Sequence, residues 1–525
     1  MQRRRFLQSL AAGLALPLPA ARAADADERL RIGIAADITT FDPHWLNTAP
    51  NLSAHGHVFE ALTRNDNDAR VVPALAQSWK TLDAHTWEFR LKPGVRFHDG
   101  SELTADDVVF SLERPNTLTG SPGPFTSATR QIAEKTAVDK LTVRIRTREP
   151  NYAPLTIDLN SIYIVSRRAA AKADEAAFSH GGAAIGTGPY KLARFTPGEG
   201  AELEAFAGYH GAKPAFGKVT MRPLTNDAAR VAALMAGDVG AIESPPTADL
   251  ARLGKDARFR VEQKVSWRTL FLHLDQGREQ TPFITAKDGK PLPTNPLRDV
   301  RVRRAISMAI NRAAIVSRVM EGNAVAAGNL VSPPIFGHDP ALKPEAFDAE
   351  GAKKLLSESG FADGFALTLH GPADRYINDD QILQAVAQML ARIGIATRVQ
   401  TYPASAYFQR MRNGEFSVAL LGWGSQSGDL ALRSLLMTPD ANAGWGAWNW
   451  GRYSSAELDA AVKKALTTLD PAAREAASRA AMGIAMKDVA AVPLHHQLAS
   501  WGTRRELRYA ARTDEFTFAF DFVRG

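Results

Sequence analysis

The sequence predicts an α/β protein, because strand patterns and helix patterns alternate along most of its length. Alternating or continuous apolar runs at 30–34 and 270–274 are typical of strands. Between 300 and 320, apolar residues recur at helical spacing and predict a core-facing helix. A later unit has the βαβ order of a mixed or parallel sheet, with a helix at 349–358, a strand at 366–370, a helix at 381–393 and a strand at 396–401.

Length and composition indicate a globular protein with more than one domain. The chain has 525 residues, enough for two large domains or for three of about 150 residues. Hydrophobic residues make up 45% of the sequence and charged residues 23%. These values exclude a disordered chain and a multi-span membrane protein.

Residues 1–23 have the features of an export signal. Three arginines at 3–5 precede an apolar stretch that reaches Leu18, and Ala21 to Ala23 form an A-x-A cleavage pattern. The Arg-Arg-x-Phe-Leu order also resembles a twin-arginine signal, so both export routes stay open. The apolar stretch is shorter than the roughly 20 residues that a membrane span needs. We expect a cleaved signal peptide and a mature protein in the periplasm.

The charge and the absence of cysteine exclude several classes of function. Removal of the four arginines in residues 1–23 leaves 59 of the 63 basic residues against 56 acidic ones, a net charge of +3. No run of five or more like charges occurs, so we expect no nucleic-acid partner. With no cysteine, the chain has no disulfide, thiolate nucleophile or site for a lipoprotein anchor.

The segment 85–114 changes its periodicity twice. Trp87, Phe89 and Leu91 alternate with polar residues and predict a half-buried strand. Two Gly-containing turns follow, and a Thr104–Asp107 capping box predicts the start of a helix. His98 and Asp99 could act as a base and its orienting carboxylate, but local hydrogen bonding in the turn is the favoured interpretation.

Other patterns give further expected elements. They are a helix at 53–62, strands at 141–146 and 190–195, a helix from 226 that stops at Gly237, a strand at 239–242 and a Pro-rich connection between lobes at 281–296.

The order of several motifs resembles the family 5 extracellular solute-binding proteins, the peptide, nickel and opine receptors of ABC importers. The motifs are WEFRLKPGVRFHDG with TADDVVFSL, GTGPYKLARFTPGE, DVRVRRAISMAINRAAIV, AKKLLSESGFADGF and GRYSSAELDAAVKKAL. The resemblance implies an α/β fold of two lobes with mixed sheets and a ligand cleft between them. It places lobe I at 28–270 with an accessory subdomain at about 55–185, lobe II at 283–490, and a return to lobe I at 498–525. Residues 85–114 are then scaffold.

The resemblance also implies a function. We expect a monomeric receptor, without catalytic activity or cofactor, that delivers a small polar solute such as a peptide or an amino-acid conjugate to a membrane permease. A nickel or metal-chelate receptor of the same fold is the alternative. A secreted hydrolase is a remote alternative, because the sequence has no G-x-S-x-G and no H-E-x-x-H motif.

The main candidate site follows a buried strand at 418–421, where ligands of open α/β sheets bind. Trp423 matches a tryptophan that borders the pocket in family peptide receptors, although a packed core tryptophan is the competing interpretation. Gly424 and Ser425 follow it. Gln426 stands where dipeptide receptors have an aspartate that binds the peptide ammonium, and a neutral amide cannot make that charge-assisted bond. Asp429 could substitute, but it matches an acid that shapes the loop.

A second group of candidates supplies an anion clamp. Arg375 and Tyr376 follow a predicted strand, and an arginine there can grip a carboxylate with two hydrogen bonds. The basic residues that follow in dipeptide receptors are replaced by Asp380 and Gln381, so a free dipeptide is not the favoured ligand. Thr40, in the polar loop after the first strand, is also a candidate binding residue.

Two aromatic groups allow more than one interpretation. Trp445, Trp448 and Trp450 could line an aromatic or sugar site, or could clamp their own loop onto the lobe. His495 and His496 could suggest nickel, but neighbouring residues on a strand face opposite sides and no further ligands accompany them. A structural pair is favoured, and no metal ligand is predicted.

Overall fold

The computed structural model describes residues 29–123 and 125–525, so the expected signal peptide lies outside the described residues. A twelve-stranded mixed sheet runs through the whole molecule. Its main order is β10 (Tyr190–Thr196), β11 (Gly200–Ala205), β12 (Lys218–Pro223), β1 (Arg29–Ile34), β13 (Ala241–Glu243), β20 (Val492–Arg504), β14 (Phe259–Leu274), β19 (Val418–Gly424), β17 (Ala366–Pro372) and β15 (Ile284–Thr285). Two further strands pair with this path, β16 (Ala324–Ala326) with β20 and β18 (Ala396–Tyr402) with β17.

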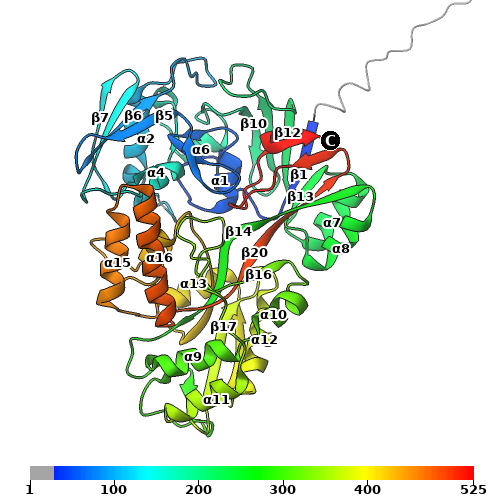
Figure 1. Ribbon diagram of the computed structural model, residues 1–525. Coiled ribbons are helices and arrows are strands. Elements are labelled where there is room, and N and C mark those ends of the chain that lie inside the picture. The colour runs from blue at the N-terminus through cyan, green and yellow to red at the C-terminus, as the bar shows by residue number, and fades with distance from the viewer. Residues whose placement is uncertain (1–28, 124) are drawn as a thin grey trace, which may run out of the picture.

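The protein has two lobes, joined by the long strands β14 and β20 (Figure 1). We call the body built around β1 the first lobe and the body built around β17–β19 the second lobe. β1 pairs in parallel with β12 and β13, and β17 pairs in parallel with β18 and β19. β14 and β20 pair antiparallel between them, so each lobe has a parallel unit and the crossing is antiparallel. The α/β class with mixed sheets is confirmed; the lobe boundaries given above stay a prediction.

Each lobe has its own hydrophobic core. The core of the first lobe includes Ile32, Phe41 and Tyr190 together with Trp501 and Phe522, so the C-terminal end of the chain closes this lobe. The core of the second lobe forms between the sheet and its helices. These helices are α9 (Val300–Ala309), α10 (Arg312–Ala314), α11 (Ala349–Glu358) and α12 (Asp379–Ala391), while α13 (Ala404–Arg412), α14 (Gly428–Leu435), α15 (Ala456–Leu466) and α16 (Pro471–Lys487) surround a separate core.

The first lobe carries a smaller antiparallel sheet. Its order is β5 (Ala76–Thr81), β6 (Thr86–Leu91), β8 (Thr142–Thr147) and β7 (Ile132–Asp139). The expected strand and capped helix are confirmed here. Trp87, Phe89 and Leu91 are buried on β6, and the Asp107 carboxylate accepts the Thr104 N–H at 3.0 Å at the start of α2 (Ala105–Thr117).

The remaining elements of the first lobe are short. The helices are α1 (Ala49–His55), α3 (Thr126–Thr129), α4 (Leu155–Asp158), α5 (Arg167–Ala170), α6 (Glu175–Ser179), α7 (Asp227–Ala236) and α8 (Thr247–Lys255). The strand pairs are β2 (Glu60–Ala61) with β9 (Tyr163–Ile164), β3 (Thr63–Asn65) with β4 (Val71–Pro73), and β21 (Leu507–Tyr509) with β22 (Phe522–Arg524). As expected, α7 ends at Gly237, which has the left-handed φ of 86° that glycine tolerates.

Three expected elements differ from the structure. The helix expected at 53–62 is α1, which has Pro50 in its first turn and ends before Gly56; the chain then becomes strand β2. The helix expected to run through 300–320 ends at Ala309, because Ile310 is extended and Asn311 caps a separate short helix. The stretch 281–296 is not the crossing between lobes: β15 within it pairs with β17, and β14 and β20 make the crossing.

Candidate ligand-binding site

The expected site forms where β19 ends beside the crossing strand β14. Their antiparallel register places Arg268 opposite Gly424 and Thr269 opposite Trp423. On its other side, β19 pairs in parallel with β17, whose end leads into the Arg375–Tyr376 loop. The strand order therefore brings both groups of predicted residues to one edge of the sheet, as parallel strand ends do in α/β proteins.

An irregularity in β14 adds residues that the sequence patterns did not single out. The pairing of β14 with β20 changes from Val265 opposite Leu498 to Thr269 opposite His496, so β14 has extra residues between these points. This is a β-bulge, which bends a strand and redirects its side chains. Within it, the Trp267 N–H donates to Thr513 O at 2.9 Å instead of to β20. The bulge thus ties the crossing strand to the C-terminal segment at the site.

The bulge presents Arg268 to Glu515. Arg268 Nη2 lies 2.6 Å from Glu515 Oε2, and the Ser266 hydroxyl donates to Glu515 Oε1 at 2.6 Å. Burial raises the pKa of the Glu515 carboxyl, but attraction to Arg268 and these hydrogen bonds outweigh it and hold the pKa below its usual value. Glu515 is therefore charged. Its backbone is also strained, because its φ of 65° is in the left-handed region.

The Arg375–Tyr376 loop is fixed by Asp379. The N–H groups of Arg375 and Tyr376 both donate to Asp379 Oδ2 at 3.0 Å. The buried Tyr376 ring packs on Gly422, and its hydroxyl donates to Gly422 O at 3.3 Å. A Cβ at Gly422 would lie 2.6 Å from that ring, so this position needs glycine. The loop and β19 therefore form one rigid unit.

Arg375 lies within electrostatic range of the Arg268–Glu515 pair. Its guanidinium carbon lies 5.3 Å from the Tyr376 ring centroid. Its side chain is exposed to solvent, yet nearby protein atoms lower its pKa by desolvation, and repulsion from Arg268 lowers it further. These observations describe a cation in an open position that is bordered by protein. Glu515 pairs with Arg268, and the Arg375 guanidinium makes no hydrogen bond or ion pair with another described residue, so it is available for a ligand anion.

Trp423 packs against the loop that contains Trp445, Trp448 and Trp450, which we call the tryptophan loop. It is half-buried and packs edge-on against Trp448, with ring centroids 5.0 Å apart. Trp448 in turn contacts Trp450 at 4.7 Å, and all three border the α13–α16 core. Trp445 packs instead under Lys463, whose Nζ lies 4.1 Å from its ring centroid. The tryptophan loop thus clamps onto its own lobe while it supports Trp423 from behind.

Two polar atoms beside Trp423 have no hydrogen-bond partner in the described part of the chain. They are Gln426 Oε1 and Trp267 Nε1, one an acceptor and the other a donor. Buried polar atoms are costly when they are unpaired, so each is suited to a ligand group. A Cβ at Gly424 would lie 2.7 Å from Trp267 Nε1, so glycine allows the indole to approach. Ser425 is different: its hydroxyl donates to Ser427 O at 2.8 Å and shapes the loop.

Asp429 is engaged in structure. Arg474 Nε donates to Asp429 Oδ2 at 2.8 Å, and Asp429 is fully buried. The competing idea that Asp429 replaces the missing acid at position 426 would require this ion pair to break.

Thr40 is buried in the first lobe, and its hydroxyl donates to Glu175 Oε1 at 2.5 Å. No hydrogen bond between described residues joins Thr40 to the group around Trp423. Its role in binding stays a prediction, as do the roles of Trp423, Gly424, Ser425, Gln426, Arg375 and Tyr376.

The histidines singled out in the sequence are buried. His496 Nδ1 lies 2.8 Å from Thr269 Oγ1, and His495 has no hydrogen-bond partner for its ring among the described residues. His98 lies 3.0 Å from Gly188 O, and Asp99 accepts from Ser101, so this pair shapes the turn. Across residues 29–123 and 125–525, no group of three or more His, Asp or Glu side chains is arranged to hold a metal ion.

The comparisons with known proteins agree with this architecture. Residues 70–443 match the model of the bacterial extracellular solute-binding proteins, family 5 Middle. The chain is 28% identical over 388 residues to the dipeptide-binding protein of Escherichia coli (strain K12), covering 68% of each chain. It is also 28% identical over 501 residues to the glutathione-binding protein GsiB of Escherichia coli O1:K1 / APEC, covering 92% of each.

A solved structure shows the same fold. The periplasmic binding protein DppA from Helicobacter pylori, in complex with peptide STSA, has 24% sequence identity and a TM-score of 0.78, with 94% of this chain and 98% of that chain covered. None of the helices described in this chain has the length and apolar character needed to span a membrane. The family match covers well over half of the sequence. The structure agrees with it, because two lobes meet beside a residue cluster that is suited to a ligand. The chain therefore belongs to family 5 of the bacterial extracellular solute-binding proteins.

Proposed function

We propose that the chain captures a small polar solute that has a free carboxylate, a peptide or an amino-acid-derived conjugate, and presents it to the permease of an ABC importer. The observation that carries this proposal is the cluster of Arg268, Arg375 and Glu515 beside Trp423. Arg268 is paired with Glu515, while the unpaired guanidinium of Arg375 is suited to one anionic group, and a hydrogen bond to a charged group is worth about 1.5–3 kcal/mol.

The other polar groups restrict the ligand further. Gln426 supplies a neutral acceptor where a ligand ammonium would need a carboxylate, so the ligand amine is blocked, conjugated or absent. Trp267 Nε1 offers one donor and Trp423 an apolar wall. The ligands in the names of similar proteins, a dipeptide, glutathione and the peptide STSA, each have a carboxylate.

Binding is expected to close the two lobes by bending at β14 and β20, as hinge proteins do. Among the hydrogen bonds that join the lobes, Asn378 Nδ2 donates to Thr247 Oγ1 at 3.1 Å, and Arg433 Nη1 donates to Tyr152 Oη at 2.7 Å. A ligand that contacts Arg268 and Arg375 together would favour the closed form, because a ligand shifts such an equilibrium only through its difference in affinity.

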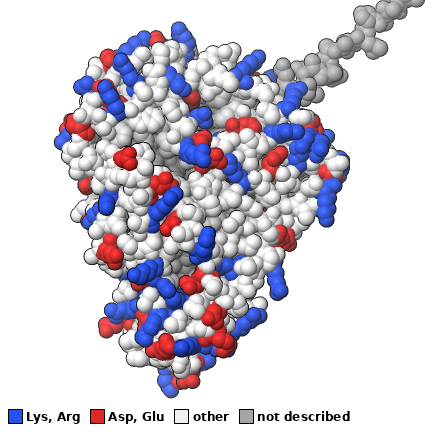
Figure 2. Space-filling view, viewed as in Figure 1, with Lys and Arg blue, Asp and Glu red and all other residues white. Residues whose placement is uncertain are grey.

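The rest of the proposal concerns the form in which the protein works. It is a periplasmic monomer, exported by its first 23 residues, that binds its solute without converting it, uses no cofactor and has no nucleic-acid partner. Acidic and basic side chains are interspersed over the face in Figure 2, which fits the weak net charge of the mature chain.

The test starts from the ligand that the protein retains. The mature chain would be purified from its natural source and mildly denatured, and the released small molecules identified by mass spectrometry. Titration calorimetry would then compare the released compound with a form whose carboxylate is converted to an amide. We expect an organic acid that binds tightly and an amide that binds at least about tenfold more weakly. Stoichiometric nickel, or equal affinity for acid and amide, would contradict the proposal.

A further inference from the structure

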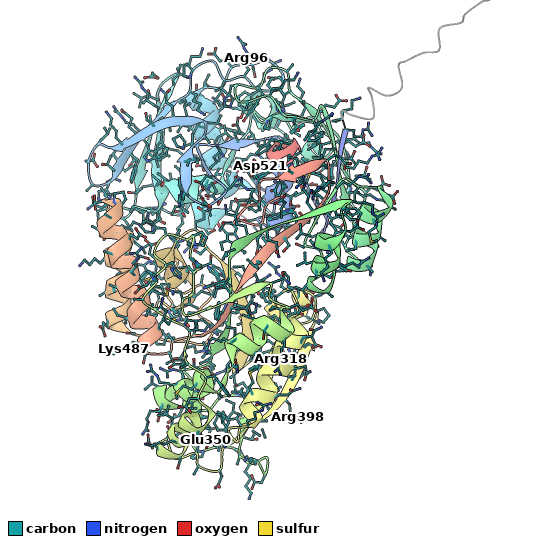
Figure 3. The ribbon with its side chains drawn as sticks, turned by 45° about the vertical axis from the view of Figure 1, so that its right-hand side comes forward. Arg96, Arg318, Glu350, Arg398, Lys487 and Asp521 are labelled. Atoms are coloured by element: carbon teal, nitrogen blue, oxygen red, sulfur yellow. The ribbon has the colours of Figure 1, made fainter. Side chains whose placement is uncertain are left out.

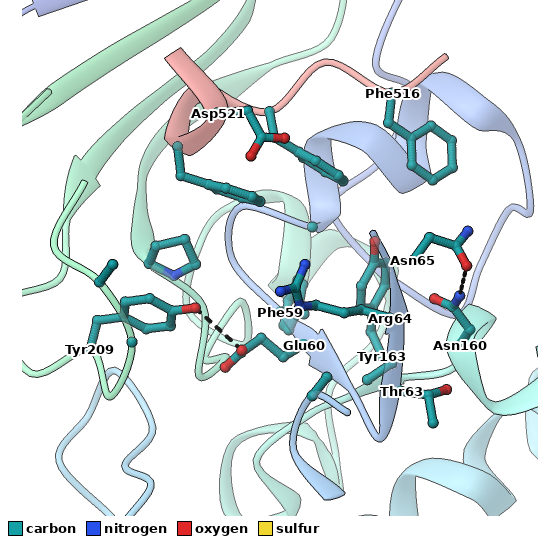
Figure 4. Close-up of a pocket in the computed structure, with 18 of the residues that line it drawn as sticks. Phe59, Glu60, Thr63, Arg64, Asn65, Asn160, Tyr163, Tyr209, Phe516 and Asp521 are labelled. Atoms are coloured by element: carbon teal, nitrogen blue, oxygen red, sulfur yellow. Dashed lines mark hydrogen bonds between the residues drawn. The ribbon is translucent and has the colours of Figure 1, made fainter. Parts of the chain in front are cut away.

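A cavity of about 480 Å³ lies in the first lobe, and its lining includes Asp514 and Phe516, the two sequence neighbours of Glu515. It is bordered by the chain around β2 and β3, by the loop at 209–214 and by the C-terminal segment 512–521 (Figure 4). None of the residues of the candidate site described above lines it. Its volume is within the range of about 300–1,000 Å³ that is typical of small-molecule sites.

Aromatic rings make up much of the wall. Phe518 and Phe520 stack with their centroids 4.8 Å apart and an interplanar angle of 14°. Phe59 and Tyr163, whose ring centroids are 6.4 Å apart, also line the cavity, and Tyr209 approaches from its own loop (Figure 4). Such rings offer a large apolar contact area to a flat ligand.

The acidic groups of the cavity are already paired. Glu60 Oε2 accepts from His210 Nε2 at 2.8 Å and from the Thr187 hydroxyl at 2.9 Å. Arg512 binds Asp514 at 2.6 Å and Asp521 at 3.2 Å. Asp521 is half-buried and belongs to the first lobe (Figure 3). These carboxylates therefore have little capacity left for a cationic ligand.

The basic groups differ from the acidic ones. For the side chains of Arg64, Lys92 and Lys213, which also line the cavity, no hydrogen bond or ion pair is recorded within residues 29–123 and 125–525. Arg64 is exposed and Lys92 is half-buried, so neither cation needs a protein partner to be stable. Arg64 lies near the centre of the view in Figure 4, with Phe59 and Glu60 beside it. Together with Arg512, these three basic side chains give four cations against the carboxylates of Glu60, Asp514 and Asp521, so the net charge of the lining is positive.

We propose that this cavity is a second binding site, which takes a small aromatic carboxylate. Arg64 and Lys92 would bind the carboxylate, and the aromatic wall would hold the ring of the ligand. Charge-assisted hydrogen bonds and ring contacts together give such a site its selectivity. Because the cavity is built from one lobe, this site can be occupied whether the two lobes are open or closed.

The test uses phenylacetate and its neutral analogue phenylacetamide as probes on the full mature chain. Ligand-observed NMR by saturation transfer detects weak binding and shows whether the ring is in contact with protein. We expect saturable binding of phenylacetate at millimolar concentrations and at least about tenfold weaker binding of phenylacetamide.

Two double variants locate the binding. Arg64→Gln with Lys92→Gln removes the two cations that are proposed to bind the carboxylate and leaves Lys213 and Arg512 in place, and it should weaken phenylacetate binding at least about tenfold. Arg96→Gln with Lys172→Gln removes two charges of the same lobe that are not in the cavity wall, and it should change nothing. Thermal melts would establish that both variants fold.

Three outcomes would overturn the second site. The first is no saturable binding of phenylacetate, and the second is equal affinity for phenylacetate and phenylacetamide. The third is unchanged binding in the cavity variant together with loss of binding in Arg375→Gln, which would place the probe between the lobes.

Discussion

Arg268 Nη2 lies 2.6 Å from Glu515 Oε2, and this ion pair links the crossing strand β14 to the C-terminal segment of the first lobe. Arg375 of the second lobe is within electrostatic range of this pair: repulsion from Arg268 lowers its pKa, and attraction to Glu515 raises it. The Glu515 carboxylate thus holds Arg268 in place and attracts Arg375, the two arginines that a ligand anion would also engage. The Arg268–Glu515 ion pair therefore links the relative position of the two lobes to the charge that a ligand meets in the site.

Replacing Glu515 by glutamine should lower stability and strengthen anion binding. The change leaves Arg268 without its ion-pair partner and removes an attraction on Arg375, which should cost about 1–3 kcal/mol of unfolding free energy and raise affinity for a carboxylate ligand. Denaturant titration and calorimetry at neutral pH measure both effects. Glu475→Gln, which breaks an exposed pair with Arg479, is the matched control and should cost about 0–1 kcal/mol. Equal effects of the two variants would refute the role given to Glu515.

Arg375→Ala should weaken binding of a carboxylate ligand by about 1.5–3 kcal/mol, because it removes a charged hydrogen-bond donor. Its side chain is exposed, so the melting temperature should hardly change. Calorimetry measures the affinity for the ligand and for the amide of its carboxylate. The variant should lose affinity for the carboxylate form and lose little for the amide. Arg398→Ala, an exposed arginine at the far end of the second lobe (Figure 3), is the control. A lost fold in Arg375→Ala would show that the residue is structural.

Gln426→Asp should raise affinity for ligands that have a free ammonium. Gln426 Oε1 is buried without a partner, so a carboxylate at this position would face the same space with a full charge. A charge-assisted bond there should add about 1.5–3 kcal/mol. Calorimetry with a dipeptide and with its N-acetylated form measures the difference. An equal gain for both forms would mean that the new carboxylate does not contact the amine.

Much of the scaffold could be predicted from sequence, because local signals decide it. The capping box at Thr104, the stop at Gly237 and the alternation of β6 all depend on residues close in the chain, and each was confirmed. The prediction of a helix at 53–62 was wrong beyond the end of α1. The apolar residues after Gly56 lie in a turn and in strand β2, and they reach the core without helical spacing. Apolar spacing alone does not separate these cases.

The site was predicted only in part for a related reason. Trp423 and Arg375 lie at strand ends, and their motifs could be recognised. Arg268 and Glu515 are 247 positions apart, and a β-bulge sets their meeting. No periodicity of side chains predicts a bulge or the register across a crossing strand. Only the folded chain shows that these two residues belong to the site.

Acidification should destabilise the protein over a defined pH range. Burial lowers the pKa of His495 from 6.5 to about 4, and it has the same effect on His44, His55, His57, His98, His273 and His370. The unfolded chain binds these protons below pH 6.5 and the folded chain does not. Stability is therefore complete above that pH and falls as the pH drops toward 4.

Thermal melts across this range measure the slope. Each buried histidine contributes at most about 1.4 kcal/mol per pH unit, so several together should lower the melting temperature steeply. His495→Gln removes one such group and should make the slope shallower than in the parent chain. A melting temperature that stays constant over the whole range would show that these histidines are accessible to protons in the folded state.

Asp429→Ala should reduce stability without changing the preference for ligands. Asp429 is fully buried and its carboxylate binds Arg474, whose side chain is 10% exposed. Loss of the acid leaves a buried arginine without a counter-charge, which costs about 3–5 kcal/mol. Asp429→Leu with Arg474→Met removes both charges and should restore most of that loss, since an apolar pair of similar size is tolerated in such positions. Denaturant titration measures the stability, and calorimetry compares a dipeptide with its N-acetylated form. If Asp429 were instead the acid that receives a ligand ammonium, Asp429→Ala would keep its stability and lose affinity only for the free amine.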